Sequence, residues 1–378
     1  MKKCFIIGLV LSLLVFSSWT PTNSLAQEDD VNAAFIYLDL LSHIPDTEAT
    51  RSLLILNDYA RAEVGLDIPR PGEISSNEQV IDFLVALTLE RRMAVDAPFV
   101  SGFHSFGIQA IETQKNNSAF DARNVFQTVV AGNPPSEFNA TNVNVPFRRI
   151  QQALLESEAF EAPEQLEHRN VPVMVWGEDF FSDFSKVMIP PVYDEIGRGQ
   201  RIGFSNQQTL LSTVWTDGVL AMIDAHQDHI PSLADDGDYL SFIEAMQALN
   251  LYSVLISDRT QDQAFADATV TPDHIRLKPY RSLLTGIGQE DGNFYMALVL
   301  LHDDEEDASE NASLLLRKIA TEDSQRAERP WTDLFEFAFI TTEVADNILQ
   351  VRLPFVNNLP RSVWIDFFLT RDMLLLHE

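Results

Sequence analysis

The chain has 378 residues, 46% of them hydrophobic, and its 56 acidic against 26 basic residues give a formal net charge of −30. A surface this acidic repels nucleic acid and anionic lipid head groups, so we expect neither as a partner. The only cysteine, Cys4, cannot form a disulfide within the chain, so stability must come from burial of a large core.

The first 26 residues have the order of a secretory signal peptide. Lys2 and Lys3 precede an apolar run over 5–16, and residues 24–26 (Ser-Leu-Ala) form a small-residue cleavage site. We predict cleavage after residue 26 and a secreted or periplasmic location. The apolar run is too short to span a bilayer, so no membrane insertion is expected after cleavage. Cys4 leaves with the signal, and the mature chain then has no thiol for catalysis or metal binding.

The segment 27–177 is predicted to form a first α+β unit. Ser75 and Glu78 are spaced like a capping box that opens a helix, and Pro146 opens a second one. Alternating or continuous apolar residues predict strands, which lie at 52–57, 106–110, 125–131 and 171–176. In chain order these elements read strand, helix, strand, strand, helix, strand.

The segment 281–378 repeats a similar order and is predicted to be a second α+β unit. Its expected strands are 280–287, 294–300, 334–340, 348–353 and 372–376, with helices over 307–319 and 362–368. Two βαββαβ units indicate a duplicated ferredoxin-like fold. The intervening segment 178–280 mixes helices and strands, and is either a third small domain or a cap on one unit.

The densest group of potential metal ligands is Asp224, His226, Asp228 and His229. Imidazole and carboxylate groups at these spacings suit zinc, manganese or nickel. The group also lies where a helix is expected to end, and histidines there commonly interact with free carbonyl groups instead. A divalent cation is the only cofactor that the sequence suggests. The acidic runs at 303–307 and 235–238 read better as helix N-termini than as calcium sites.

Two further groups of residues indicate ligand binding. Arg198 and Arg201 lie in the glycine-rich, locally basic stretch 197–203, which either cradles an anion or forms a plain turn. Trp176, Phe180 and Phe184 either line an apolar ligand site or fill the core. No catalytic residue is predicted, because the serine motif at 103–107 lacks the first glycine of a nucleophile elbow.

Two functions from different classes remain. The first is an exported, non-enzymatic protein that binds a small-molecule ligand or a basic, exported protein partner. The alternative is an extracytoplasmic metal-dependent hydrolase that uses the cluster at 224–229. We favour the first because every catalytic template fails, and an enzyme is the less favoured class.

Overall fold

The computed structural model describes residues 35–72, 74–87, 114–187, 189, 191–194, 196–206, 208–258, 275–324, 328–358 and 373–376. The predicted signal peptide, the strand expected at 106–110 and the helix expected at 362–368 lie outside these residues.

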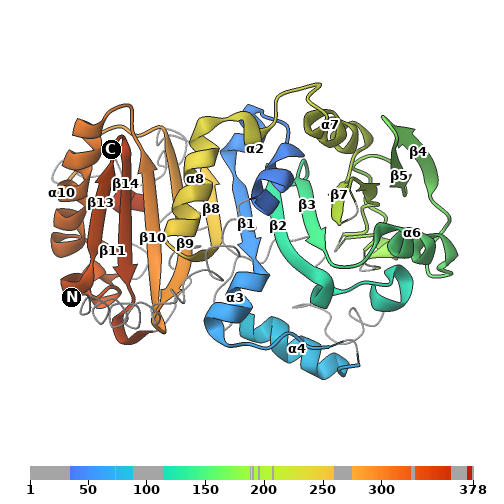
Figure 1. Cartoon of the computed structure of the whole chain (residues 1–378), viewed down its shortest axis with the longest axis horizontal. Coiled ribbons are helices and arrows are strands. Elements are labelled where there is room, and N and C mark those ends of the chain that lie inside the picture. Colours follow the sequence, from blue (N-terminus) through green and yellow to red (C-terminus); the bar gives the residue numbers. More distant parts are fainter. Residues whose placement is uncertain are drawn as a thin grey trace, which may run out of the picture.

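The described strands form one antiparallel sheet of twelve strands. In chain order they are β1 (Leu54–Asp58), β2 (Val125–Ala131), β3 (Phe138–Val143), β4 (Glu164–His168), β5 (Val171–Val175), β6 (Arg201–Phe204), β7 (Thr209–Thr213), β8 (Leu251–Ser257), β9 (Ser282–Glu290), β10 (Asn293–Leu301), β13 (Thr341–Ala345) and β14 (Ile348–Pro354). Their spatial order is β13-β14-β10-β9-β8-β1-β2-β3-β7-β6-β5-β4. Figure 1 shows β13 and β14 beside α10 at one end of the molecule and β4 and β5 beside α6 at the other. A separate two-stranded ladder joins β11 (Asp323–Ser324) to β12 (Arg329–Pro330).

The prediction of two ferredoxin-like units is wrong. β8, from the segment 178–280, pairs with β1 on one side and β9 on the other, and so joins the predicted first and second units in one sheet. Leu54 lies opposite Ile256 in the β1–β8 ladder. The order of elements along the chain suggested two small sheets, but pairing between such distant segments leaves no trace in a local pattern. The fold is α+β, with a single large sheet.

One face of the sheet is covered by α3 (Tyr59–Leu66), α4 (Asn77–Val85), α6 (Phe147–Glu156) and α10 (Glu305–Thr321). Each helix buries one apolar stripe, as Phe83 of α4 and Leu315 of α10 illustrate. Asp304 caps α10, whose first turn carries three acidic residues. This confirms the predicted role of the acidic run as a helix N-terminus.

The other face is covered by the helix over 35–42, by α7 (Thr216–His226) and by α8 (Gly237–Ala248). Tyr37, Met222 and Phe242 are buried in this second core. The short helix α2 (Glu48–Ser52) leads from these helices into β1. The two cores on opposite faces, with the sheet between them, account for most of the buried apolar residues, and burial of this kind is the main stabilising contribution to folding.

Several local predictions hold and others do not. β2 matches its predicted range, whereas α4 is capped by Ser76 with Gln79 rather than by the predicted pair one position earlier. The strand expected at 334–340 is wrong, because this stretch contains the short 3-10 helix Phe337–Phe339 and follows another that ends at Asp333. The last strand, expected at 372–376, is also wrong, since Met373–Leu376 is a 3-10 helix.

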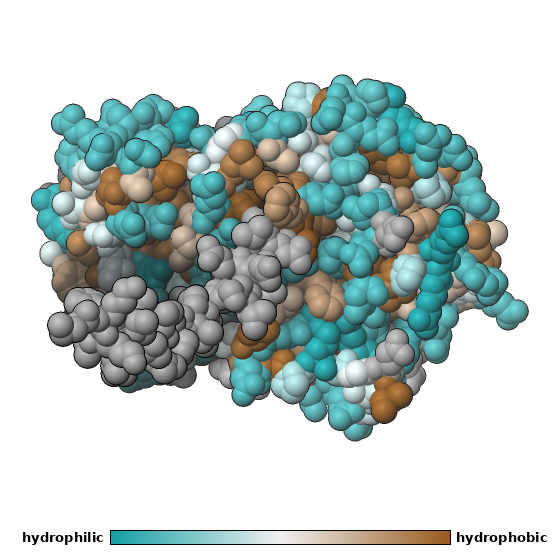
Figure 2. All heavy atoms as spheres, viewed as in Figure 1, coloured by the Kyte–Doolittle hydropathy of each residue, from teal (hydrophilic) through white to brown (hydrophobic). Residues whose placement is uncertain are grey.

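Among the described helices, none combines the length and apolar composition needed to cross a bilayer. Polar residues cover much of the face seen in Figure 2, and the exposed apolar residues fall in separate groups between them.

Candidate functional site

Four large apolar side chains are exposed on the long connection between β5 and β6, three within residues 180–184 and one at Ile196. Phe181 and Phe184 are 58% and 76% exposed, and Phe180 and Ile196 are 44% and 40% exposed. We call these four residues the aromatic patch. Phe180 and Phe184 were singled out from the sequence, and the structure places both at the surface rather than in the core.

The backbone of the aromatic patch is held in an uncommon conformation. Phe180 has a φ of 59°, which is sterically unfavourable for an aromatic residue, and its N–H donates to the carbonyl of Val214 at 3.1 Å. Its ring stacks on Trp215 with centroids 5.4 Å apart, and Trp215 in turn meets Phe138 edge-on. Strained residues that the surroundings hold in place are concentrated at functional sites. Phe180 therefore rests on an aromatic base formed by Trp215 and Phe138.

The chain next to Ile196 packs closely against the segment 180–184. The N–H of Asp183 donates to the carbonyl of Gly197 at 3.1 Å, and Ser182 forms a β-bridge with Arg198. Gly197 has a φ of 78°, and a Cβ atom there would lie 2.0 Å from the carbonyl oxygen of Asp183. Only glycine permits this contact. Gly197 thus serves the packing of one loop against the other beside the aromatic patch.

Both arginines of the predicted anion site have partners within the fold. Arg198 forms an ion pair with Asp194 at 2.6 Å. Arg201 is buried, donates to the carbonyls of Gly199 and Gly177, and pairs with Asp179. Burial lowers the pKa of Arg201, and the nearby carboxylate opposes this shift.

Trp176, predicted to line the apolar site, is buried beneath this region. Its ring N–H donates to the carbonyl of Glu161 at 2.9 Å. The side chain of the same glutamate pairs with Lys186, and this hydrogen bond raises the pKa of the lysine. Each basic group near the aromatic patch is therefore matched by an acidic one, and the rim of the patch keeps additional carboxylates, such as exposed Glu178.

The predicted metal-binding group is divided by the fold. Asp224 turns toward the turn between β4 and β5, where it contacts His168 at 2.8 Å and Arg169. Asp228 and His229 follow the end of α7, where their backbone N–H groups close its last turn. His226 turns in another direction, toward the helix over 35–42.

His226 belongs to a different cluster, which includes Asp39, His43 and Ser205. The rings of His43 and His226 stack with centroids 3.9 Å apart and planes 9° apart. His43 is fully buried, and its Nε2 lies 2.7 Å from the hydroxyl of Ser205. A carboxylate oxygen of Asp39 and one ring nitrogen of each histidine lie within 4.8 Å of one another. Sequence reasoning missed Asp39, His43 and Ser205, which no motif marks.

Ser205 and His43 lie as close together as a nucleophile and its general base, but His43 is not basic enough for that role. Burial, followed by the nearby His226, lowers the pKa of His43 to about 4. A general base works best when its pKa is near the operating pH. His43 is therefore too weak a base to activate Ser205 at neutral pH.

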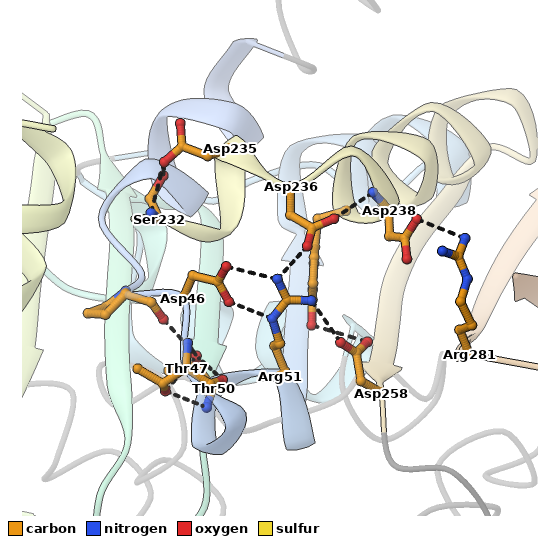
Figure 3. A network of polar contacts seen from close by, with 12 residues as sticks. Asp46, Thr47, Thr50, Arg51, Ser232, Asp235, Asp236, Asp238, Asp258 and Arg281 are labelled. Carbon is orange, nitrogen blue, oxygen red and sulfur yellow. Dashed lines mark hydrogen bonds and ion pairs between the residues drawn. The ribbon is translucent and has the colours of Figure 1, made fainter. Parts of the chain in front are cut away.

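The remaining acidic group, 235–238, is structural. Figure 3 shows Asp235 bonded to Ser232, and Asp236 directed both at Arg51 and at the start of α8. Asp236 is the N-cap of α8, as the sequence indicated for this stretch. Arg51 also contacts Asp46 and Asp258, so three carboxylates surround one guanidinium.

Comparison with known proteins adds little. No protein-family model and no curated protein matches the chain. Crystal forms III, I and IV of TP0453 resemble it at TM-scores of 0.40, 0.39 and 0.41, each with 6% sequence identity. The alignments cover 86–88% of this chain and 97–99% of those chains. Similarity this distant supports no inference about function.

Proposed function

We propose that this protein is an exported, non-enzymatic binding protein that docks a protein partner on its aromatic patch. The observation that carries the proposal is the exposure of Phe181 and Phe184, each more than half exposed on a loop that hydrogen bonds hold in place. Contiguous exposed apolar side chains are costly in water and commonly mark interaction sites. Aromatic residues are also enriched among the side chains that dominate binding energy.

The charge around the patch defines the kind of partner. Glu178, Asp179 and Asp183 lie in the same loop, and the whole chain has a net charge of −30. A partner that presents aliphatic or aromatic side chains among lysine and arginine residues would match both features. The signal peptide predicted for the first 26 residues supports a partner outside the cytoplasm.

The hydrolase alternative has weaker support. Asp224 is engaged by His168 and Arg169, and so is not directed at the same point as His226. Of the two serine–histidine contacts among the described residues, the one between Ser205 and His43 contains a histidine of low basicity. In the other, the hydroxyl of Ser42 donates to the carbonyl of Asp39 and not to His226. Neither arrangement brings a nucleophile and an effective base together.

A peptide library displayed on phage tests the proposal. The bait is the purified protein, and the comparison is a double variant, Phe181→Ser with Phe184→Ser, which leaves Phe180 and its stacking on Trp215 in place. We expect selected peptides to combine apolar with basic residues, and to bind the double variant at least about tenfold more weakly. Their binding should also weaken at high salt.

Phe339→Ser provides the matched control, because Phe339 is 66% exposed but lies in a 3-10 helix that precedes β13. This variant should bind the peptides like the wild type. Peptides that bind the double variant as well as the wild type, or that lack both apolar and basic residues, would contradict the proposal.

A further inference from the structure

We infer that Asp39, His43 and His226 form a binding site for a divalent transition metal, with zinc as the best match. The site joins the helix over 35–42 to the C-terminal end of α7, beside the turn between β6 and β7. It is separate from the aromatic patch and does not depend on the function proposed above.

The hydrogen bonds leave one ring nitrogen of each histidine with its lone pair. Nδ1 of His43 lies 2.7 Å from the carbonyl oxygen of Asp39 and so carries the proton, because a carbonyl only accepts. Nε2 of His43 therefore keeps its lone pair, which now accepts from Ser205. The hydroxyl of Ser42 donates to the same carbonyl at 2.6 Å, and it is then free to accept from Nδ1 of His226 at 2.8 Å. Nε2 of His226 likewise keeps its lone pair.

The carboxylate of Asp39 is oriented in the same way. Its Oδ2 accepts from Asn206, in the turn between β6 and β7, at 3.0 Å and from Thr209, at the start of β7, at 3.1 Å. This leaves Oδ1 as the ligand atom. Histidine ligands usually donate their other N–H to a carbonyl or carboxylate, and carboxylate ligands are hydrogen-bonded in turn. The supporting contacts of a metal site are thus already in place around all three residues.

The electrostatics favour a cation at this position. Within the described part of the chain, no lysine or arginine forms an ion pair with Asp39. A divalent cation would supply the positive charge that the carboxylate lacks.

The ligand set indicates which cation is bound. Two imidazole nitrogens and one carboxylate oxygen suit zinc, which takes three protein ligands and a water in an open tetrahedral site. Calcium and magnesium prefer oxygen ligands and are not expected here. Binding requires the stacked rings to tilt, because parallel rings 3.9 Å apart do not direct their lone pairs at one point. Metal binding should therefore break the stacking of His43 and His226.

Titration calorimetry of the tag-free protein, after removal of metals with EDTA, tests the inference with zinc chloride as the probe. We expect one zinc per chain and a rise in melting temperature on zinc addition. His226→Gln and Asp39→Asn should each weaken zinc binding by at least about tenfold, and Asn206→Ala, which removes a supporting contact, by about 10–100-fold. Calcium should give no heat of binding at the same concentrations.

His229→Gln is the matched control, because His229 lies three residues beyond His226 and outside the cluster. This variant should bind zinc like the wild type. Circular dichroism of each metal-free variant shows whether it folds, and if one ligand variant does not fold, the other decides. Absence of zinc binding by the wild type would overturn the inference. Equal affinity in the wild type and a folded ligand variant would also overturn it.

Discussion

The guanidinium of Arg51 lies 3.1 Å from the carboxylate of Asp258, a residue 207 positions further along the chain. The same group makes two hydrogen bonds to Asp46 and one to Asp236, and it also lies over the ring of Tyr239. Figure 3 shows these acidic residues converging on Arg51 from separate segments. One side chain therefore joins α2, the start of α8 and the end of β8, near the middle of the sheet.

Replacing Arg51 with Met should destabilise the protein by about 2–3 kcal/mol. The change leaves three partly buried carboxylates without their shared cation, a cost between those of exposed and of buried ion pairs. Burial already raises the pKa of Asp258, and the loss of Arg51 removes an interaction that opposes this shift. Urea unfolding measures the change, and Arg148→Met, at an exposed position, is the control. If Arg51→Met lost no more stability than Arg148→Met, Arg51 would not hold these segments together.

Asp58→Asn should change how stability depends on pH. Asp58 is buried at the end of β1, where its carboxylate caps α3 by accepting from the N–H of Arg61. Burial raises the pKa of Asp58 above its usual 3.8. The native state thus binds more protons than the unfolded state between these two values, and stability falls as the pH rises through this interval.

Asparagine keeps the cap but carries no charge. As the pH rises above about 4, the stability of the variant should therefore rise relative to that of the wild type, by about 1.4 kcal/mol for each unit by which the pKa is raised. Urea unfolding at several pH values measures this difference. Asp67→Asn, at the exposed C-terminal cap of the same helix, is the control and should not change the pH dependence. If the stability of the wild type instead rose relative to that of the Asp58→Asn variant as the pH increased, the prediction would be wrong.

The fold could be predicted element by element but not as a whole. β2 is a mostly apolar stretch, and its range follows from that pattern. β4 has no apolar alternation, because it is an exposed edge strand that carries Glu164 and Glu167. Charged residues on an edge strand hinder pairing with other chains, and they also hide the strand from a hydrophobic pattern.

The candidate sites also differ in how much of them the sequence reveals. Phe180 and Phe184 could be found from the sequence, because they are close together in one loop. His226 was also found, but its partner Ser42 is 184 residues away, and the cluster around it depends on how α7 packs beside the helix over 35–42. Contacts of this kind are set by tertiary packing, and no local spacing reveals them.

Arg201→Met should cost more stability than Arg198→Met. Arg201 is buried and bonds to three backbone carbonyl groups, whose hydrogen bonds would be lost. We expect a loss of about 3 kcal/mol or more for Arg201, but about 1 kcal/mol for the partly exposed pair of Arg198 and Asp194. Urea unfolding measures both losses. If the arginines serve the fold, inorganic phosphate should leave the melting temperature of the wild type unchanged, and a clear rise would instead favour an anion site.

Gly286→Val tests whether the sheet unfolds as one unit. Gly286 lies in β9, and an added Cβ would lie 2.6 Å from the side chain of Val254 and 3.0 Å from the carbonyl of Ser253 in β8. The substitution therefore strains the ladder that joins the two halves of the sheet, and overpacking of this kind costs about 1–3 kcal/mol. Gly237→Ala, where no other atom lies within 4 Å, is the control.

Hydrogen exchange measured by mass spectrometry shows which strands lose protection when Gly286→Val destabilises the protein. A sheet that unfolds cooperatively should lose protection in β2 and β3 as well as in β9 and β10, with one transition in urea. Loss of protection confined to β9, β10 and β14, together with two separate transitions, would mean that the ladder between β8 and β9 divides two independently stable parts. The expectation of one transition follows from the pairing of β8 with both β1 and β9, which leaves no break in the sheet at this point.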